Sequence, residues 1–128
     1  MRAYGSWLAV ALCLAAAAPA SAAPDAPRGE QVYTRCLACH ALAGDRVGPR
    51  HCGVVGRRAG TVPGFAYSPA MKNSGLTWDE KTLDMFLRKP MQMLPGTAMT
   101  YDGVPDPKDR GDLIAYLKKA AASAECRK

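Results

Sequence analysis

Apolar residues recur at helical spacing in three parts of this chain. In the first, Val32, Tyr33 and Cys36 fall on one face of a segment covering residues 27–38. Pro27 suits the first turn of a helix, where the missing N–H has no partner to lose. The pattern predicts a helix over 27–38 with Tyr33 in the core.

Two further helices are predicted toward the C-terminus. Residues 77–80 have the Thr-x-x-Glu form of a capping box, and apolar residues follow at helical spacing up to residue 89, before Pro90. The last helix, 106–122, opens with an aspartate N-cap followed by Pro107. Few residues alternate as strands would, so the sequence predicts an all-α protein.

Glycine and proline dominate the connections between these helices. Residues 44–64 hold six glycines and two prolines, a density too high for a regular helix or strand. A second loop covers residues 90–105. Long loops without regular structure are unusual in a small domain unless they surround a ligand. We expect two ordered loops that wrap a bound group.

The first 22 residues have the pattern of a cleaved signal peptide. Arg2 precedes an apolar run over 7–18, which is too short to span a bilayer, and Ala20 and Ala22 form a small-residue cleavage site. The sequence therefore predicts export to the periplasm and one folded domain over residues 23–128.

The net charge of the chain is +6, and about +5 remains once Arg2 is removed. A moderate positive charge favours acidic protein partners or anionic membrane surfaces. The basic residues are scattered and do not alternate with aromatic ones, which argues against nucleic-acid binding.

The sequence Cys36-x-x-Cys39-His40 carries the clearest chemistry. Two thiols at this spacing can each bond to one vinyl group of haem, while the adjacent imidazole binds the iron. A thioredoxin-like redox pair would need a βαβ setting that is missing here, and a zinc site would need a second close ligand pair, which Cys52 and Cys126 do not form in sequence. The motif predicts one haem c, attached covalently through two thioethers.

An electron-carrying haem iron needs a second axial ligand, and methionine opposite histidine raises its potential. Met85 falls inside the predicted helix 77–89, where we expect it to pack in the core. Met99 follows a Pro95-Gly96 turn that can hold a side chain against a planar group. The pattern favours Met99 as the ligand.

Over residues 27–122 the chain resembles the class I cytochromes c, of the mitochondrial-like soluble bacterial type. The resemblance implies the fold of that family, in which short helices and long loops surround one haem. Its landmarks, in order, are residues 36–40, 47–49, 53–60, 64–68, 76–78, 95–99 and 113–117.

The resemblance implies a role for each matching residue. Cys36 and Cys39 would form the thioethers, with His40 and Met99 as the iron ligands. The carbonyl of Pro49 would accept a hydrogen bond from His40, which fixes the ring and strengthens its donor nitrogen.

Other matching residues would hold the haem propionates. Buried carboxylates are costly unless hydrogen-bond donors surround them. The donors at the matching positions are Arg57, Tyr67, Trp78 and Thr97. The resemblance also implies that the first and last helices meet, through Gly29, Tyr33, Leu113 and Tyr116.

Some residues depart from the family pattern. Phe86 replaces a tyrosine whose hydroxyl reaches the methionine sulfur in many relatives. His51 and Cys52 stand where mitochondrial members usually have leucine first, and we expect His51 to be a hydrogen-bonded structural residue. The match puts Cys52 near the end of the last helix, so we expect a disulfide with Cys126 in an oxidising compartment.

The resemblance implies a diffusible, monomeric one-electron carrier without enzymatic activity. It would work in a respiratory chain, between a membrane reductase such as a cytochrome bc complex and an oxidase, a reaction centre or a dehydrogenase. The alternative is a haem peroxidase or a gas-ligand sensor in which Met99 is labile, although a peroxidase would need a distal acid or base and His51 is the only free histidine.

Contact with the partner complexes would be transient and would use acidic docking surfaces. Lysines that surround the haem edge in mitochondrial relatives are replaced here by Met91, Gln92 and Ala98. The positive charges that could still form this rim are Arg35, Arg46, Lys72, Arg88, Lys89 and Lys108.

Overall fold

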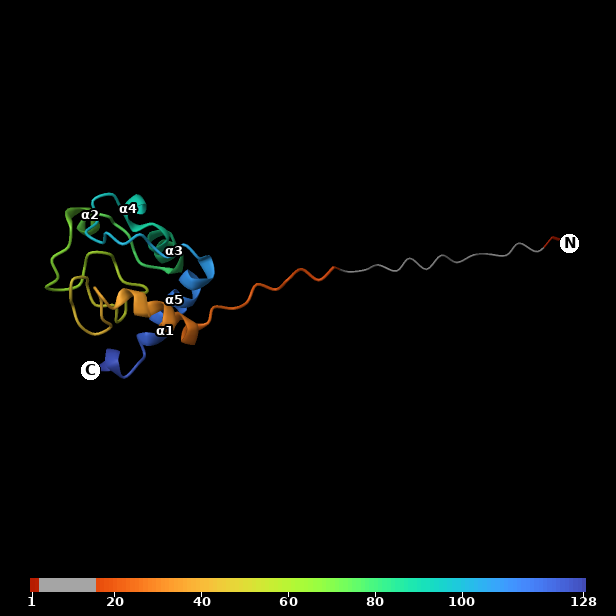
Figure 1. Ribbon diagram of the computed structural model, residues 1–128, viewed down its shortest axis with the longest axis horizontal. Coiled ribbons are helices and arrows are strands. Elements are labelled where there is room, and N and C mark those ends of the chain that lie inside the picture. Colours follow the sequence, from red (N-terminus) through yellow and green to blue (C-terminus); the bar gives the residue numbers. More distant parts are fainter. Residues whose placement is uncertain (3–15) are drawn as a thin grey trace.

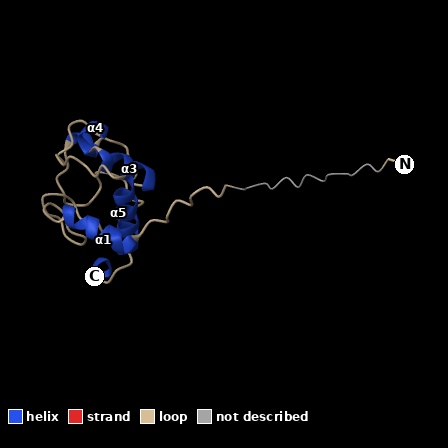
Figure 2. Cartoon of the chain, turned by 45° about the vertical axis from the view of Figure 1, so that its right-hand side comes forward, coloured by secondary structure: helices blue, strands red, loops and turns tan. Residues whose placement is uncertain are grey.

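The computed structural model describes residues 1–2 and 16–128, and in these ranges helices joined by long loops form the fold (Figures 1 and 2). The one pairing of extended backbone there is an antiparallel bridge between Arg58 and Thr77. The predicted all-α class is confirmed. The helices are α1 (Ala26–Tyr33), η1 (Thr34–Cys36), α2 (Pro69–Lys72), α3 (Glu80–Arg88), α4 (Pro90–Met93), α5 (Pro107–Ala120) and η2 (Glu125–Arg127).

The predicted signal peptide is only partly covered, because its residues 3–15 lie outside the described residues. Residues 16–25 are described, are exposed, and have no helix. None of the helices in the described ranges is both long enough and apolar enough to cross a membrane. The signal peptide and the domain boundary at residue 23 stay predictions.

The first predicted helix is divided in two. α1 begins after Asp25, whose carboxylate accepts a hydrogen bond from the Arg28 amide at 3.1 Å. It ends at Tyr33, and the chain then tightens into η1. The Thr34 hydroxyl donates to the Gln31 carbonyl at 2.7 Å, a side-chain bond of the kind that competes with helical backbone pairing.

A capping box starts α3, but two residues later than predicted. The N-cap is Asp79, which accepts a hydrogen bond from the Thr82 amide at 2.7 Å while the Thr82 hydroxyl accepts one from the Asp79 amide at 2.9 Å. Thr77 does not cap the helix because its backbone forms the bridge with Arg58.

The prediction that Met85 packs in the core is wrong. The side chains that α3 buries are Leu83, Phe86 and Leu87, at the i, i+3 and i+4 positions of one face. Met85 lies off this face and is 46% exposed.

Two single-turn helices were not predicted: α4 lies in the predicted loop 90–105, and α2 lies in a stretch to which no element was assigned. α2 and α4 each begin with a proline, Pro69 and Pro90. Proline interrupts the middle of a helix but is favourable at its first position. A helix of a single turn has no repeating apolar pattern, so the sequence gives no signal that predicts it. α5 ends at Ala120, two residues before the predicted end.

α1 packs most extensively against α5, as predicted, and the two helices lie side by side in Figure 1. Gly29 permits this contact, because a Cβ atom there would collide with the Asp112 carbonyl and with Cβ of Tyr116. Nearby, the rings of Tyr33 and Tyr116 pack at 5.2 Å between centroids.

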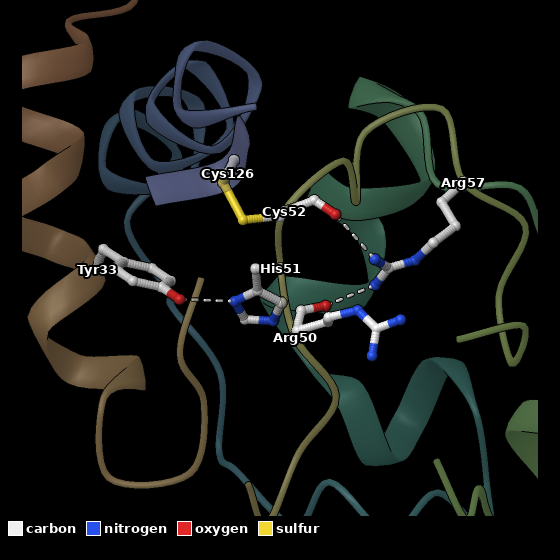
Figure 3. Close-up of a disulfide and its surroundings, with 6 residues drawn as sticks. All are labelled: Tyr33, Arg50, His51, Cys52, Arg57 and Cys126. Carbon is white, nitrogen blue, oxygen red and sulfur yellow. Dashed lines mark hydrogen bonds between the residues drawn. A yellow bond between two sulfur atoms is a disulfide. The ribbon is translucent and has the colours of Figure 1, made fainter. Parts of the chain in front are cut away.

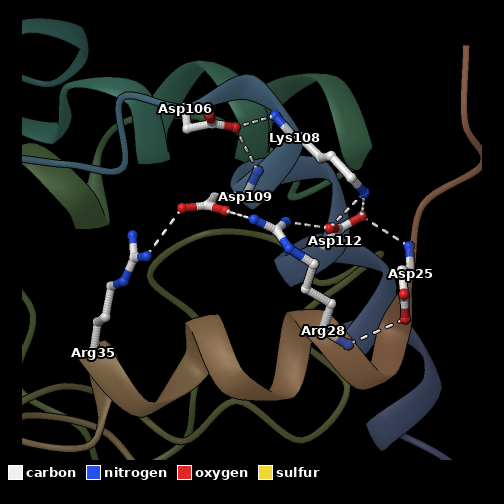
Figure 4. Close-up of polar contacts among 7 residues, drawn as sticks. All are labelled: Asp25, Arg28, Arg35, Asp106, Lys108, Asp109 and Asp112. Atoms are coloured by element: carbon white, nitrogen blue, oxygen red, sulfur yellow. Dashed lines mark hydrogen bonds and ion pairs between the residues drawn. The ribbon is translucent and has the colours of Figure 1, made fainter.

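Charged residues join the same two helices (Figure 4). Asp112, only 1% exposed, accepts hydrogen bonds from the guanidinium of Arg28, the ammonium of Lys108 and the backbone amide of Asp25. Burial opposes ionisation of Asp112, but these donors outweigh it and lower its pKa to about 2. Arg28 also pairs with Asp109.

Candidate functional site

The loops and the inner faces of α3 and α5 enclose a cavity of about 380 Å³. Leu83 and Leu87 from α3 and Leu113 and Leu117 from α5 form apolar parts of its wall. A cavity of this size and polarity suits a small-molecule cofactor. All nine predicted site residues line it, namely Cys36, Cys39, His40, Pro49, Arg57, Tyr67, Trp78, Thr97 and Met99.

His40 is buried, and one of its ring nitrogens forms a hydrogen bond. Its Nδ1 lies 2.8 Å from the carbonyl oxygen of Pro49, and because a carbonyl can only accept, Nδ1 donates. Burial lowers the pKa of His40, and the bond to Pro49 opposes this shift without cancelling it. The ring is therefore neutral with Nε2 unprotonated, the form that binds a metal.

Cys36 and Cys39 are free thiols on the turn that leads into His40. The amides of Cys39 and His40 both donate to the Cys36 carbonyl, at 3.1 and 2.9 Å, so the motif is compact. Burial raises the pKa of Cys36 to about 11. A protonated thiol of this kind does not suit disulfide exchange, which needs a thiolate.

Two methionines line the cavity, Met99 and Met71. Met99 lies in the loop after α4, where its amide donates to the Thr97 hydroxyl at 3.2 Å. The Thr97 amide in turn donates to the Leu94 carbonyl at 3.0 Å. These bonds hold the Met99 backbone in place, and Gly96 in the same loop lies against Ala70 of α2.

The predicted propionate donors lie on the cavity wall with hydrogen-bonding capacity left. Arg57 donates to the carbonyls of Cys52 and Arg50, at 3.3 and 2.9 Å, which uses two of its five N–H groups (Figure 3). The Tyr67 hydroxyl accepts from the Val62 amide at 3.1 Å, which leaves its proton free to donate. Trp78 and Thr97, on the same wall, are buried.

His51 is hydrogen-bonded, as predicted, through a 3.0 Å contact between its Nδ1 and the Tyr33 hydroxyl (Figure 3). Its ring also stacks on His40, with centroids 4.1 Å apart and planes inclined by 20°. Burial, assisted by the positive charges that His40 and Arg57 can carry, lowers the pKa of His51 to about 3. The stacking was not predicted, because it requires the chain to fold back between the two residues.

The predicted disulfide between Cys52 and Cys126 is present, with 5.4 Å between the two Cα atoms (Figure 3). It ties the loop that carries His51 and Arg57 to the segment after α5. Oxidised cysteines have no thiolate to offer a metal, which removes them from the zinc site considered above.

Gly48 is a site residue that sequence reasoning treated only as a landmark. A Cβ atom at this position would overlap the His40 ring. The backbone of the loop therefore lies directly against the imidazole. The sequence did hold a signal for this close approach. Gly48 immediately precedes Pro49, whose carbonyl was expected to accept a hydrogen bond from His40.

Comparison with known proteins identifies similar chains. The model of the family described as cytochrome c matches residues 26–121. Cytochrome c2 of Rhodomicrobium vannielii is 50% identical over 111 residues, covering 84% of this chain and 89% of the relative. Cytochrome c of Tetrahymena pyriformis is 51% identical over 96 residues, covering 73% and 87%. The solved structure of cytochrome cH from Methylobacterium extorquens matches with a TM-score of 0.73 at 47% identity, covering 74% of this chain and 98% of that one.

Proposed function

The chain belongs to the cytochrome c family, and we propose that it carries single electrons through one haem c held by Cys36, Cys39, His40 and Met99. A bound haem supplies the one-electron iron couple. The observation that carries the proposal is that both thiols, the free Nε2 side of His40 and Met99 meet in one cavity. The residues present fit this cofactor in size, polarity and donor set.

The remaining site residues prepare the cavity for that cofactor. Pro49 fixes the His40 ring and makes Nε2 a stronger donor. Arg57 and Tyr67 offer donors to the acidic groups of the haem. The apolar side chains of α3 and α5 exclude water, which sets the local dielectric and so the potential of the iron.

The position of His51 favours a carrier over a peroxidase. His51 is the only other histidine of the chain, and it stacks on His40 and bonds to Tyr33. His51 therefore lies beside His40, the proposed iron ligand. It is not available as an acid or base on the Met99 side of the cavity, where peroxide would have to bind. A thioether ligand from Met99 would complete the iron coordination and leave no open position for peroxide or a gas.

The proposed partners are redox proteins with acidic docking surfaces, met transiently in the periplasm after removal of residues 1–22. Half of the basic residues considered for docking are already paired: Arg35 with Asp109, Arg88 with Asp84 and Lys108 with Asp112. Of the other three, Arg46 donates a hydrogen bond to the Leu37 carbonyl. Lys72 and Lys89 are exposed and, within the described part of the chain, have no carboxylate in ion-pair range. We assign the docking charge to this pair.

An optical spectrum of the haem-loaded protein tests the proposal. We expect a low-spin oxidised form with a methionine-to-iron charge-transfer band. The band should vanish in Met99→Ala and persist in the matched variant Met71→Ala, because both methionines line the cavity but only Met99 is the proposed ligand. A high-spin oxidised form would contradict a carrier, and a band lost only in Met71→Ala would transfer the ligand role to Met71.

A further inference from the structure

We propose that His51 is a positioning residue for His40, which fixes the plane of the axial imidazole and thereby tunes the electron affinity of the iron. The inference rests on the proposed role of His40 as an iron ligand. It concerns a residue at which this chain departs from the leucine usual in mitochondrial members of the family.

The first step is that the His40 ring is confined on several sides. Its Nδ1 is bonded to the Pro49 carbonyl at 2.8 Å, and the Gly48 backbone lies against it too closely to admit a Cβ atom. His51 adds a nearly parallel ring at 4.1 Å between centroids. Rotation of the His40 imidazole about its Cβ–Cγ bond would drive the ring into His51.

The second step is that His51 is itself anchored, so it can act as a fixed wall. Its backbone amide donates to the carbonyls of Ala41 and Leu42, at 3.1 and 3.0 Å, just after His40 in the chain. Its side chain is held by the hydroxyl of Tyr33, a residue of α1 that is only 3% exposed. The next residue, Cys52, is fixed by the disulfide.

The third step concerns the charge on the iron. As a ligand, His40 would share the positive charge that the iron gains on oxidation. An aromatic face is electron-rich, so the stacked His51 ring stabilises positive charge on His40 more than a leucine side chain could. His51 should therefore favour the oxidised state and lower the midpoint potential.

The test compares His51→Leu and Tyr33→Phe in the haem-loaded full-length protein. One readout is the midpoint potential, and the other is the set of haem-methyl proton shifts of the oxidised protein, which depend on the orientation of the axial imidazole plane. We expect His51→Leu to raise the potential and redistribute the methyl shifts. Tyr33→Phe, which removes only the hydroxyl, should change the shift pattern in the same sense by less.

Tyr116→Phe is the matched control, because Tyr116 packs on the Tyr33 ring and should leave both readouts at their wild-type values. Variants that lower the melting temperature but keep the wild-type potential and methyl shifts would overturn the positioning role and leave His51 as packing alone. If His51→Leu does not take up haem, the Tyr33→Phe variant alone provides the test. A wild-type potential and wild-type methyl shifts in that variant would overturn the positioning role. If the wild-type protein shows no signals from a histidine bound to iron, the proposed function is wrong. If the wild type shows these signals but the variants keep its potential and methyl shifts, only the inference about His51 is wrong.

Discussion

Phe86 lies against Trp78, with 5.0 Å between their ring centroids, on the wall of the cavity that Met99 also lines. The Phe86 side chain is 5% exposed and has no group that can donate a hydrogen bond. In many members of this family a tyrosine takes this position and reaches the methionine sulfur. The thioether of Met99 therefore lacks that donor in this chain.

Restoring the hydroxyl with Phe86→Tyr should raise the midpoint potential. A hydrogen bond to the sulfur withdraws electron density from the iron and favours the reduced state. A net bond of roughly 0.5–1 kcal/mol corresponds to a rise of about 20–40 mV, measured by potentiometric titration. The same change should weaken the bond between Met99 and oxidised iron, so the charge-transfer band should be lost at lower pH.

Phe65→Tyr is the control for this prediction. Phe65 also lines the cavity, but it packs against Tyr67, with 4.8 Å between ring centroids. We expect this variant to keep the wild-type alkaline titration. Equal potentials and equal alkaline titrations in Phe86→Tyr and wild type would show that the missing hydroxyl has no effect on Met99.

Removal of the disulfide in a Cys52→Ala/Cys126→Ala double variant should lower the free energy of unfolding. The bridge closes a loop of 74 residues, worth roughly 4 kcal/mol on the chain-entropy model. Denaturant unfolding measures the difference, and a reductant should destabilise the wild type while leaving the double variant unaffected. Free thiols at both positions in mass spectrometry of the unreduced protein would contradict the bridge.

Asp112→Asn should destabilise the contact between α1 and α5 and alter its response to acid. The pKa of Asp112 is lowered from its ordinary value of 3.8 to about 2. Its carboxylate therefore contributes fully to the free energy of unfolding above about pH 3.8, and this contribution is lost as the pH falls toward about 2. The variant should lose about 2–3 kcal/mol at pH 7 and show a flatter stability curve between pH 4 and 2. Glu80→Gln, which breaks an exposed pair with Lys118, should cost less than about 1 kcal/mol. Parallel acid curves for wild type and Asp112→Asn would refute the prediction.

Gly29→Ala and Gly111→Ala should have opposite effects on stability. A methyl group at Gly29 would collide with the Asp112 carbonyl, so we expect a loss of about 2 kcal/mol or more. Gly111 in α5 has open space, and alanine there should stabilise the helix by up to about 1 kcal/mol. Thermal unfolding of the two variants provides the measurement, and an equally stable Gly29→Ala protein would contradict the close helix contact.

Electron transfer to an acidic redox partner should slow as salt concentration rises, because salt screens the charges that bring the two proteins together. A Lys72→Gln/Lys89→Gln variant should react more slowly at low salt and show a weaker salt dependence. Arg35→Gln should change the rate less, since Arg35 already pairs with Asp109. Stopped-flow rates over a range of ionic strength test this, and a salt-independent rate would indicate apolar docking, to which the exposed Met91 could contribute.

Apolar periodicity predicted the helical class, and the compact motif from Cys36 to His40 predicted the covalent attachment of a haem. The resemblance to the class I cytochromes c, rather than any local pattern, supplied Pro49 and the four donors that also line the cavity. Local reasoning failed where distant segments meet. The bridge between Arg58 and Thr77 makes Asp79, and not Thr77, the N-cap of α3. The chain also folds back after His40, so that the ring of His51 stacks on the ring of His40. Neither pairing leaves a periodic pattern in the sequence.

The bond between Cys52 and Cys126 also constrains how the protein is assembled. Residues 23–128 contain four cysteines, and the bridge between Cys52 and Cys126 is the one pairing among them that leaves both Cys36 and Cys39 reduced for thioether formation. In an oxidising compartment such as the proposed periplasm, maturation would therefore have to oxidise one pair and protect the other. A mispaired chain would be unable to take up its cofactor, so the yield of holoprotein depends on the order in which these two covalent steps occur.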